Sequence, residues 1–571
     1  MFLFLRILCI HILNSILRTV LVQESFDIVK KTRIDEMDMI SELPEPILHH
    51  ILSFLPFKQV ARTCVLSKKW EETWRTYPVF KIDESILFPK DEWRYLDKRM
   101  KSLNYLEQTL RNRHFKDLVC MEKFRMKTKL FGEEFVSFVD RCICYAIGNN
   151  VKKLKLGIYS IGNDVKKMNL GILSKRWHEL EFVLKSNRWY DLPPIVLCAK
   201  SIEVLKLRGC KLELPRKINV KLASLRRMHL VEVYSNSHVI NNLLAGCPLI
   251  EEIGISNCEG IESVELFGLE RLNDIMIADN MGLERVDMKK LNVSSLSIFQ
   301  PLTIPFEINI TICTNLKNLK FVEAYITDEW LCQLIYELPL LECLELCHCK
   351  ELKRIKISSP SLKTFSIFGC MYVVELKIDT LNLTHFTYDG GMMFLCLNAL
   401  ALSNVDLSLF RSNTDTYWNA KFIELLAQFH KFSEMLSLRV SKNEEFIVSK
   451  ELRQMIPSPL SSCKHLNLRI DTISQPFSIA KVVDELLWIA PHIKTLSIEY
   501  FLSGAFKKTS FEFSYKKPLV YEDEISSCGN SFPLSCWQYC IEKVKLEFND
   551  CEGNSTKGYS LEGREFLEKI Y

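Results

Sequence analysis

The chain has 571 residues, 25% of them charged and 48% hydrophobic, and 74 basic against 70 acidic side chains leave a formal net charge of +4. This apolar content excludes a wholly disordered chain, and the near balance of charge excludes a polybasic nucleic-acid binder. The 21 cysteines are odd in number and scattered, so we do not expect the disulfide framework of a small secreted domain. The length fits about four domains or one long repeat array, and the repeats described below favour the array.

Residues 1–36 form an apolar N-terminal extension. A spanning helix needs about 20 largely apolar residues, whereas the first 22 are interrupted by charged and polar side chains. A cleavage site for a signal peptide is not clear before Gln23. Met37 and Met39 stand directly before the first module, so we favour an upstream extension outside the mature protein over a membrane anchor or a buried amphipathic helix.

Residues 37–80 predict three short helices. Pro44 and Pro46 lie where the first helix would begin, a position at which proline costs little. Pro56 would end that helix, a second is predicted over 58–65, and Ser67 can cap a third that carries Trp70 and Trp74 one turn apart. The apolar stripe of the first helix comprises Ile47, Leu48, Ile51, Leu52 and Leu55.

This segment of about 40 residues is near the size below which a lone domain needs a disulfide, a metal or a partner. Its apolar side chains contribute roughly 1.5–3 kcal/mol each when they are fully buried. We therefore expect part of this surface to contact another protein. The alternative, packing of the stripe on the rest of the chain, stays open because spacing alone does not separate the two.

The run ISELPEPILHHILSFLP from Ile40 to Pro56, followed by VLSKKW from Val65 to Trp70 and by Trp74, closely resembles the F-box of plant F-box proteins with leucine-rich repeats. Pro46 and the acidic Glu71-Glu72 depart from the usual pattern and affect the expected affinity more than the identity. The resemblance implies docking on a Skp-type adaptor and, through it, on a cullin. The implied adaptor-facing residues are Leu43, Pro44, Ile47, Leu48, Ile51, Leu52 and Leu55, with Val60, Leu66, Trp70 and Trp74 completing that surface or forming the small core behind it.

Residues 81–150 are mixed and helix-leaning, and we expect a helical connector. Its cations include Arg111, Arg113, Lys123, Arg125, Lys127 and Lys129. Acidic residues such as Glu107 and Glu122 are interleaved with them, so we favour a solvated helix face over an anion or nucleic-acid site.

Residues 151–502 repeat a short strand pattern with an apolar centre at intervals of 21 to 26 residues, close to the period of 20–29 residues of leucine-rich repeats. The centres are Leu156, Phe182, Leu207, Leu230, Ile255, Ile277, Ile298, Phe321, Leu346, Ile367 and Tyr388. Longer repeats are expected to follow, with strands near Leu402, Leu438, Leu468 and Ile498. The predicted fold is an α/β chain in which a small helical F-box precedes an irregular leucine-rich-repeat solenoid, or horseshoe.

Two further marks support the array. Cysteine or asparagine stands three residues after five of the centres, where the repeat consensus places a buried polar side chain that satisfies backbone groups; these residues are Cys210, Cys258, Asn280, Cys349 and Cys370. Segments 243–255, 334–346 and 486–498 each predict an outer helix, a proline stop and an inner strand.

The residues flanking each centre should point out from the concave sheet. No single charge sign and no aromatic ladder dominates among them. They include Lys155, Glu181, Lys206, Arg208, His229, Met276, Phe299, Lys320, Glu345, Phe368 and Asp389. We therefore expect the concave face to bind a target protein that the sequence does not name.

Residues 503–571 begin with an irregular stretch. The run CWQYCIEKVKL from Cys536 to Leu546 resembles the opening of the FBD-type module of many plant F-box and leucine-rich-repeat proteins. The chain ends at Tyr571, soon after this opening, so we expect a truncated FBD-like module.

Catalytic and metal-binding patterns are weak. His178-Glu179 opens a zincin-like pattern, but Phe182 takes the place of the second histidine. Cys343, Cys347, His348 and Cys349 form the densest cluster of metal-ligand types, yet Cys347 flanks a strand centre and Cys349 holds the consensus slot. We expect no enzyme, no metal and no cofactor.

The sequence thus predicts a substrate-recognition subunit of an SCF-type ubiquitin ligase, in the nucleus and/or cytoplasm, that binds no nucleic acid. One alternative is a secreted or membrane-associated leucine-rich-repeat binding protein, favoured by the apolar N-terminus and by glycosylation-type triplets at Asn292, Asn309 and Asn382. Another is a scaffold that binds the adaptor without a ligase role.

Overall fold

The computed structural model describes residues 43–84, 96–113, 120–130, 133–160, 189–215, 220–289, 291–299, 307–308, 310, 313–411, 417–430, 435–442, 444–473, 477–502, 505–515, 541–550, 557–562 and 565. The chain divides into two compact units. The small unit comprises Met1–Tyr77 and Asn112–Lys116, and the repeat unit comprises Pro78–Arg111 and Asp117–Tyr571. The N-terminal extension lies outside the described residues.

The small unit contains α2 (Glu45–Ser53), α3 (Phe57–Arg62), the short 3-10 helix η1 (Thr63–Val65) and α4 (Lys68–Thr76). Pro44 and Pro56 are the N-cap residues of α2 and α3, where a proline removes no helical hydrogen bond. The Ser67 hydroxyl accepts a hydrogen bond from the Trp70 amide over 3.3 Å and so caps α4. The three predicted helices are confirmed.

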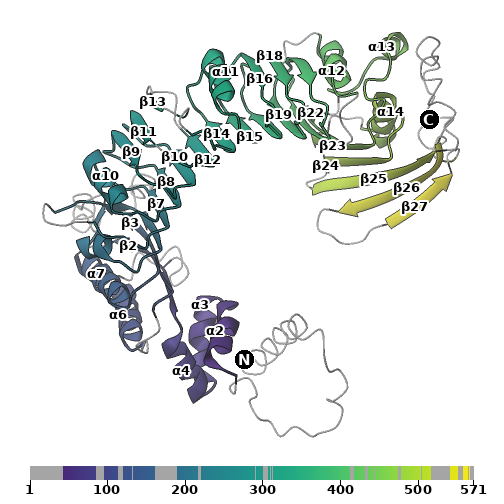
Figure 1. Ribbon diagram of the computed structural model, residues 1–571. Helices are drawn as coiled ribbons and strands as arrows, with labels where there is room; N and C mark the ends of the chain where they lie inside the picture. The colour runs from purple at the N-terminus through teal and green to yellow at the C-terminus, as the bar shows by residue number, and fades with distance from the viewer. Residues whose placement is uncertain are drawn as a thin grey trace, which may run out of the picture. The chain divides into compact units, whose positions relative to one another are not determined.

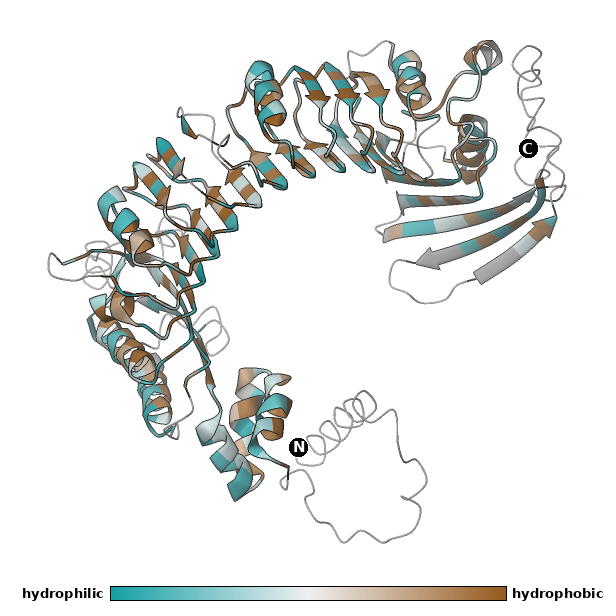
Figure 2. Ribbon diagram, viewed as in Figure 1, coloured by the Kyte–Doolittle hydropathy of each residue, from teal (hydrophilic) through white to brown (hydrophobic). Residues whose placement is uncertain are grey.

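The repeat unit is built on a 19-stranded sheet in which each strand pairs with the strand of this sheet that follows it along the chain. Pairing is parallel from the first strand to β24, and the last three strands join antiparallel (Figure 1). Figure 2 shows hydrophobic and hydrophilic residues alternating along these strands. The strands are β1 (Val79–Asp83), β2 (Lys123–Leu130), β3 (Lys153–Ser160), β5 (Val204–Arg208), β7 (Arg227–Val231), β8 (Glu252–Ser256), β10 (Asp274–Ala278), β12 (Ser295–Phe299), β14 (Asn318–Val322), β15 (Cys343–Cys347), β17 (Thr364–Phe368), β19 (His385–Gly390), β21 (Asn404–Leu409), β22 (Met435–Lys442), β23 (His465–Thr472), β24 (Thr495–Leu502), β25 (Ala505–Tyr515), β26 (Ile541–Asp550) and β27 (Lys557–Glu562).

The predicted strand centres pair with one another from strand to strand. Leu156 is the register partner of Leu207, which pairs with Leu230, and the series continues without a slip to Tyr388. The strand expected near Leu402 is β21, whose in-register residue is Leu407. Phe182 lies outside the described residues, and the direct pairing of β3 with β5 leaves no place between them for the strand predicted around it.

Residues 81–150 differ from the expected helical connector. They contain α6 (Leu96–Arg111) and α7 (Glu133–Gly148), but also β2, and together with β1 this strand starts the sheet. In β2, buried Phe124, Met126 and Thr128 alternate with cations that face solvent. The sequence analysis interpreted these cations as one solvated face of a helix. In the structure they are the exposed side of a strand, in which every second residue is buried.

On the outer side of the sheet, the connecting element depends on repeat length. Where strand centres lie 25 to 31 residues apart, the connection includes a helix: α7, α10 (Ser237–Ala245), α11 (Asp328–Glu337), α12 (Trp418–Ala427), α13 (Lys450–Met455) or α14 (Ile479–Ile489). Between Ile255 and Leu407 the centres otherwise lie 19 to 23 residues apart, and there the connection is a short strand: β9 (Ser263–Phe267), β11 (Arg285–Lys289), β13 (Glu307–Ile308), β16 (Arg354–Ser358), β18 (Glu375–Asp379) or β20 (Phe394–Asn398). A strand advances about 3.3 Å per residue and a helix about 1.5 Å, so the strand spans the repeat with fewer residues.

Candidate partner-binding surfaces

The core of the small unit is formed by five predicted site residues. Leu48, Leu52, Val60, Trp70 and Trp74 are all buried. The ring of Phe57 lies 5.4 Å from that of Trp74, centroid to centroid. These helices therefore enclose a compact core from few residues, as the Trp pair one turn apart on α4 predicts.

Arg113 belongs to this core although it lies far along the chain. Its guanidinium carbon is 4.1 Å from the centroid of the Trp74 ring, and its Nη1 donates a hydrogen bond to the Tyr77 carbonyl over 2.9 Å. Only 3% of the residue is exposed. One cation of the predicted basic stretch thus serves the small unit and is not available to an anion.

His49 joins α2 to α4. Its Nε2 lies 3.2 Å from the Thr76 hydroxyl and 3.3 Å from the Thr73 carbonyl. Burial lowers the pKa of His49 from its ordinary value, although the nearby Glu45 carboxylate and the bond to Thr73 oppose this shift. The imidazole thus links the two helices by polar contacts, and its burial favours the uncharged form.

The small unit also leaves large apolar side chains exposed. Ile47 is 47% exposed, Phe54 57%, Val65 67% and Leu66 39%, and we call these four residues the apolar face. Ile47 lies on α2, and Phe54, seven positions later, is the C-cap residue of that helix, so the two point to one side of it. Val65 ends η1, and Leu66 is its C-cap residue before α4. These side chains are open to a partner as the structure stands.

The predicted site residues therefore separate into two groups. Leu48 and Leu52 lie in the core and support the apolar face without forming it. Pro44 is exposed, while Leu43, Ile51 and Leu55 are half-buried. Phe54 and Val65 belong to the apolar face but are not among the predicted site residues; the spacing of seven positions from Ile47 is the sequence signal that indicates Phe54.

The inner face of the long sheet starts with a row of cations. Lys81, Arg125, Lys155 and Lys206 occupy the same register position on β1, β2, β3 and β5, and His229 follows on β7. Each stands one residue before a buried centre and therefore points away from the core. We call the first four residues the basic ladder.

Farther along the sheet the inner face is mixed in charge. Lys320 pairs with Glu345 over 2.5 Å, and Arg439 pairs with Asp471 over 3.0 Å. The expected mixture of charges is found in this part of the face, whereas the basic ladder gathers cations on the first four strands, two of which precede the repeat array as it was predicted. There, parallel pairing places β1 and β2 of the supposed connector beside β3 and β5 and gathers their cations.

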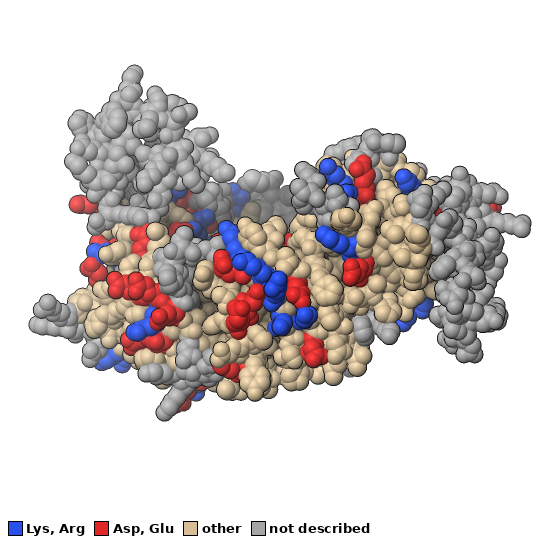
Figure 3. All heavy atoms as spheres, turned by 90° about the horizontal axis from the view of Figure 1, so that it is seen from above, with Lys and Arg blue, Asp and Glu red and all other residues tan. Residues whose placement is uncertain are grey.

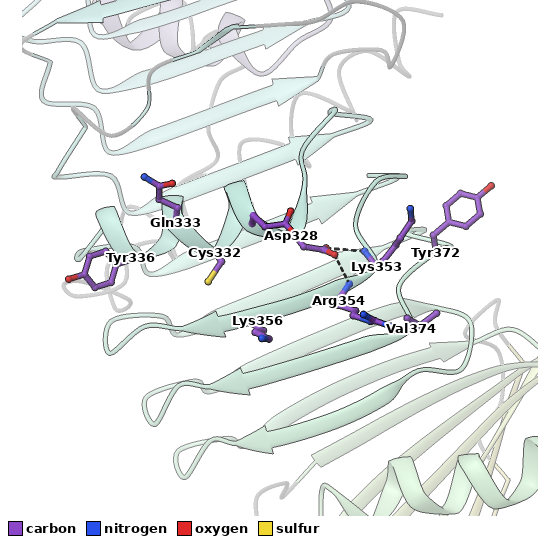
Figure 4. Close-up of a pocket in the computed structure, with 10 residues that line it drawn as sticks. Asp328, Cys332, Gln333, Tyr336, Lys353, Arg354, Lys356, Tyr372 and Val374 are labelled. Carbon is purple, nitrogen blue, oxygen red and sulfur yellow. Dashed lines mark hydrogen bonds between the residues drawn. The ribbon is translucent and has the colours of Figure 1, made fainter.

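The outer side of the repeat unit contains a pocket between α11 and β16 (Figure 4). Asp328 stands at the start of α11, and its carboxylate accepts hydrogen bonds from the Lys353 and Arg354 amides, both over 2.9 Å. Tyr336 and Tyr372 also line this pocket. Asp328 thus covers the start of an outer edge strand.

The face of the molecule that is seen from above carries charges of both signs (Figure 3). Lys and Arg lie among Asp and Glu on this face, so neither sign forms a separate patch.

The consensus cysteines and asparagine have structural roles. The Asn280 amide donates to the Ile255 carbonyl and its oxygen accepts from the Cys258 amide, both over 3.0 Å. Burial raises the pKa of Cys210 to about 12 and that of Cys258 to about 11, so these thiols stay protonated. Within the described residues, no group of three or more His, Cys, Asp or Glu side chains is placed to hold a metal ion.

Membrane-spanning helices are not found among the described residues, since none of the helices there is long and apolar enough. The apolar residues 1–22 and the triplet at Asn309 lie outside those residues. In the parts of the chain that the structure describes, the cysteines are free thiols.

Known proteins resemble both units. The F-box domain family matches residues 40–82, and the family described as At1g61320/AtMIF1, LRR domain, matches residues 145–311 and 303–499. An internalin of solved structure from Listeria monocytogenes is 10% identical, and the match covers 68% of this chain and 97% of the internalin chain. The TM-score of 0.30 is too low to support an argument.

Relatives from Arabidopsis thaliana share this organisation. The F-box/FBD/LRR-repeat protein At1g78750 is 25% identical over 40% of this chain and 44% of its own length, and the F-box/LRR-repeat protein At5g02910 is 26% identical over 43% and 44%. The F-box/FBD/LRR-repeat protein At2g04230 is 25% identical over 68% of this chain and 80% of its own length. The chain thus spans less than half the length of the first two relatives. The repeat match covers more than half of the chain, which belongs to the family of the At1g61320/AtMIF1 LRR domain and carries an F-box domain before it.

Proposed function

We propose that the chain is the substrate-recognition subunit of an SCF-type cullin-RING ubiquitin ligase. The small unit docks on a Skp-type adaptor, and through it on a cullin, while the repeats bind the target protein. The role is positional, because a target held beside the ligase meets the charged ubiquitin-conjugating enzyme at a high local concentration. The chain itself performs no chemistry, and it acts in the nucleus and/or cytoplasm.

The observation that supports docking is the apolar face. Single exposed apolar residues are common on protein surfaces, but here four come from a unit with a core of few side chains. Burying them under a partner would contribute about 25 cal/mol for each Å² of apolar area removed from water. The half-buried Leu43, Ile51 and Leu55, with exposed Pro44, extend the proposed contact.

Co-purification with a Skp-type adaptor tests the proposal. We expect wild-type protein to bind and the double variant Ile47→Asp with Val65→Asp to lose binding, because two carboxylates would be buried without partners. The matched control is Met281→Asp with Tyr336→Asp, which makes the same change at exposed positions of the repeat unit. Failure of the wild-type protein to bind, or equal binding by both variants, contradicts the docking role.

Substitutions at Leu48 do not serve this test. Leu48 is buried, so we expect Leu48→Asp to unfold the small unit and to abolish binding for a structural reason. Deleting residues 1–36 is a better second variant, and we expect adaptor binding to survive it. Loss of binding after this deletion would assign the extension a structural role.

A scaffold that binds the adaptor without a ligase role makes a different prediction. Reconstitution with adaptor, cullin and RING subunits separates it from the ligase subunit. We expect the cullin to join the complex only when the apolar face is intact. A stable complex with the adaptor that never recruits the cullin would favour the scaffold.

A further inference from the structure

The basic ladder is a row of cations on one face of the sheet. Neighbouring strands are about 4.8 Å apart, so the four side chains span roughly 14 Å. Lys81, Arg125, Lys155 and Lys206 have no ion pair with any described residue. Gly157 follows Lys155 by two positions on β3 and has no side chain to cover the row.

More cations lie beside the ladder. Lys123 and Lys153 are register partners on β2 and β3, two positions before the ladder residues of these strands, and Arg227 stands at the matching position of β7. The pKa of Lys123 and that of Lys155 are both lowered, first by burial and then by neighbouring cations. The fold thus holds like charges together at a cost in stability.

Four acidic residues near this end of the sheet pair with residues outside the ladder. Glu122 pairs with Lys152 and Lys153, the Glu232 carboxylate pairs with Arg208, and Glu252 pairs with His229 over 2.7 Å. Glu107 lies on α6 and pairs with Arg111 and Arg141, both over 2.8 Å. The acids that are interleaved in sequence with the cations therefore do not neutralise the ladder.

We propose that the basic ladder binds an acidic, extended segment of a target protein, rich in aspartate or glutamate. This inference rests on the proposed function for the identity of the ligand as a target. A carboxylate can approach each ladder cation from the open side of the sheet, and flexible Lys stems adapt to the spacing of acidic side chains along a peptide. Such charge pairing selects the partner and speeds its association more than it adds to affinity.

The surroundings of the ladder favour a peptide over a nucleic acid. Single-stranded nucleic acids bind basic grooves through bases stacked on free aromatic rings. Among the described residues of β1, β2, β3 and β5, the aromatic ring on the inner face is that of Tyr159, and it lies 5.7 Å from Lys127 Nζ and 5.3 Å from the Arg208 guanidinium carbon. Because Lys127 and Arg208 both lie against this ring, it does not offer a free face on which a base could stack.

The test uses the full chain and a fluorescein-labelled peptide of alternating glutamate and glycine, with fluorescence anisotropy as readout. We expect binding that weakens as salt rises, and no binding of the matched glutamine peptide. In the quadruple variant Lys81→Gln, Arg125→Gln, Lys155→Gln and Lys206→Gln, we expect roughly tenfold weaker binding or more, because four charge pairs are lost together.

The matched control neutralises four cations of the outer side: Lys353→Gln, Arg354→Gln, Lys356→Gln and Lys377→Gln. We expect this variant to bind the glutamate peptide as the wild type does. Equal loss in both variants would mean that only net charge matters and would overturn the inference. A single-stranded RNA of the same charge that binds more tightly than the peptide would also overturn it.

Two further measurements separate ligand binding by the ladder from a structural role of the ladder and from the proposed ligase role. The ladder variant should melt no lower than the wild type, because neutralising crowded cations relieves repulsion; a large fall would assign the ladder a structural role instead. Adaptor binding should be unchanged in this variant. If the wild-type protein binds the adaptor but not the glutamate peptide, the ladder proposal fails while the proposed ligase role stands.

Discussion

The small unit and the repeat unit bury their apolar side chains in different ways. In the repeat unit each strand centre is buried against the centres of neighbouring strands, so the core is continuous from Leu156 to Ile498. The small unit has no such neighbours, and its core depends on a few large side chains such as Trp70 and Trp74. It leaves Ile47, Phe54 and Val65 exposed.

The two units differ in the side chains that they expose. In the repeat unit, apolar residues mainly build the fold, and the inner face presents polar and charged side chains to solvent. In the small unit the apolar residues serve both purposes, because α2 buries one side and exposes another. We therefore expect apolar burial to drive binding of the proposed adaptor to the small unit. We expect charge complementarity to direct binding of the proposed target to the repeat unit.

The largest expected effect concerns the small core. Trp74→Ala should lower the free energy of unfolding of the small unit by about 3–5 kcal/mol, since it removes the ring that contacts Phe57 and Arg113. Amide exchange of α4 as a function of urea measures this loss. Tyr336→Ala, at a residue 86% exposed on α11, is the control and should change little. A small effect at Trp74 would mean that the small unit does not depend on this core.

Turn geometry in the repeat unit gives the next effect. Gly209 has a φ of +72°, and a Cβ there would lie 1.8 Å from the Ile158 carbonyl oxygen. Gly209→Ala should therefore destabilise the repeat unit by about 2–3 kcal/mol. Gly148→Ala, where a Cβ meets nothing within 4 Å, should be neutral or stabilising by up to about 1 kcal/mol. Chemical denaturation that ranks the two variants in the reverse order would contradict this account of the turn.

The consensus slot gives a third, smaller effect. Asn280→Ala leaves the Cys258 amide and the Ile255 carbonyl without their partner and should cost about 1–3 kcal/mol. Asn280→Cys should cost less, because the thiols of Cys258 and Cys370 occupy the equivalent slots of other repeats. Thermal melts of the two variants make the comparison, and equal losses would show that the slot needs an amide in this repeat.

The smallest expected effect is a pH dependence confined to the small unit. The pKa of His49 is lowered on folding, so the unfolded chain takes up the proton first as pH falls below about 6.5. The stability of the small unit should therefore be fully present above that pH and decrease as pH falls toward the lowered pKa. Ring NMR signals of His49 measure the pKa directly, and His49→Gln should flatten the decrease. Titration of His49 above 6.5 would reverse the predicted sign.

Much of this fold could be predicted from the sequence because the repeats depend on local patterns. Strand centres such as Leu230 and Leu346 were predicted correctly, since each is an apolar residue at a fixed interval and pairs with the next. The helices of the small unit followed from Pro44, Ser67 and the spacing of the two tryptophans. The positions of Cys258 and Asn280 followed from the repeat consensus.

Other features depend on contacts that no local pattern contains. The basic ladder joins Lys81 to Lys206 through three strand pairings, and the sequence separates these residues by long, partly helical segments. Phe182 fits the period but not the sheet, because β3 pairs directly with β5. Some of the predicted adaptor-facing residues are buried in the core and others are exposed. An apolar stripe on a helix does not indicate which of Ile47 and Leu48 faces the core.

The central claim is that the apolar face of the small unit is covered by a Skp-type adaptor. Hydrogen–deuterium exchange of the full chain, with and without purified adaptor, tests it most directly. The account predicts slower exchange on adaptor binding in α2 and in the segment from η1 to α4, with no change in the inner strands β10 to β17. Unchanged exchange in α2 and η1, or protection confined to the repeat unit, would contradict it.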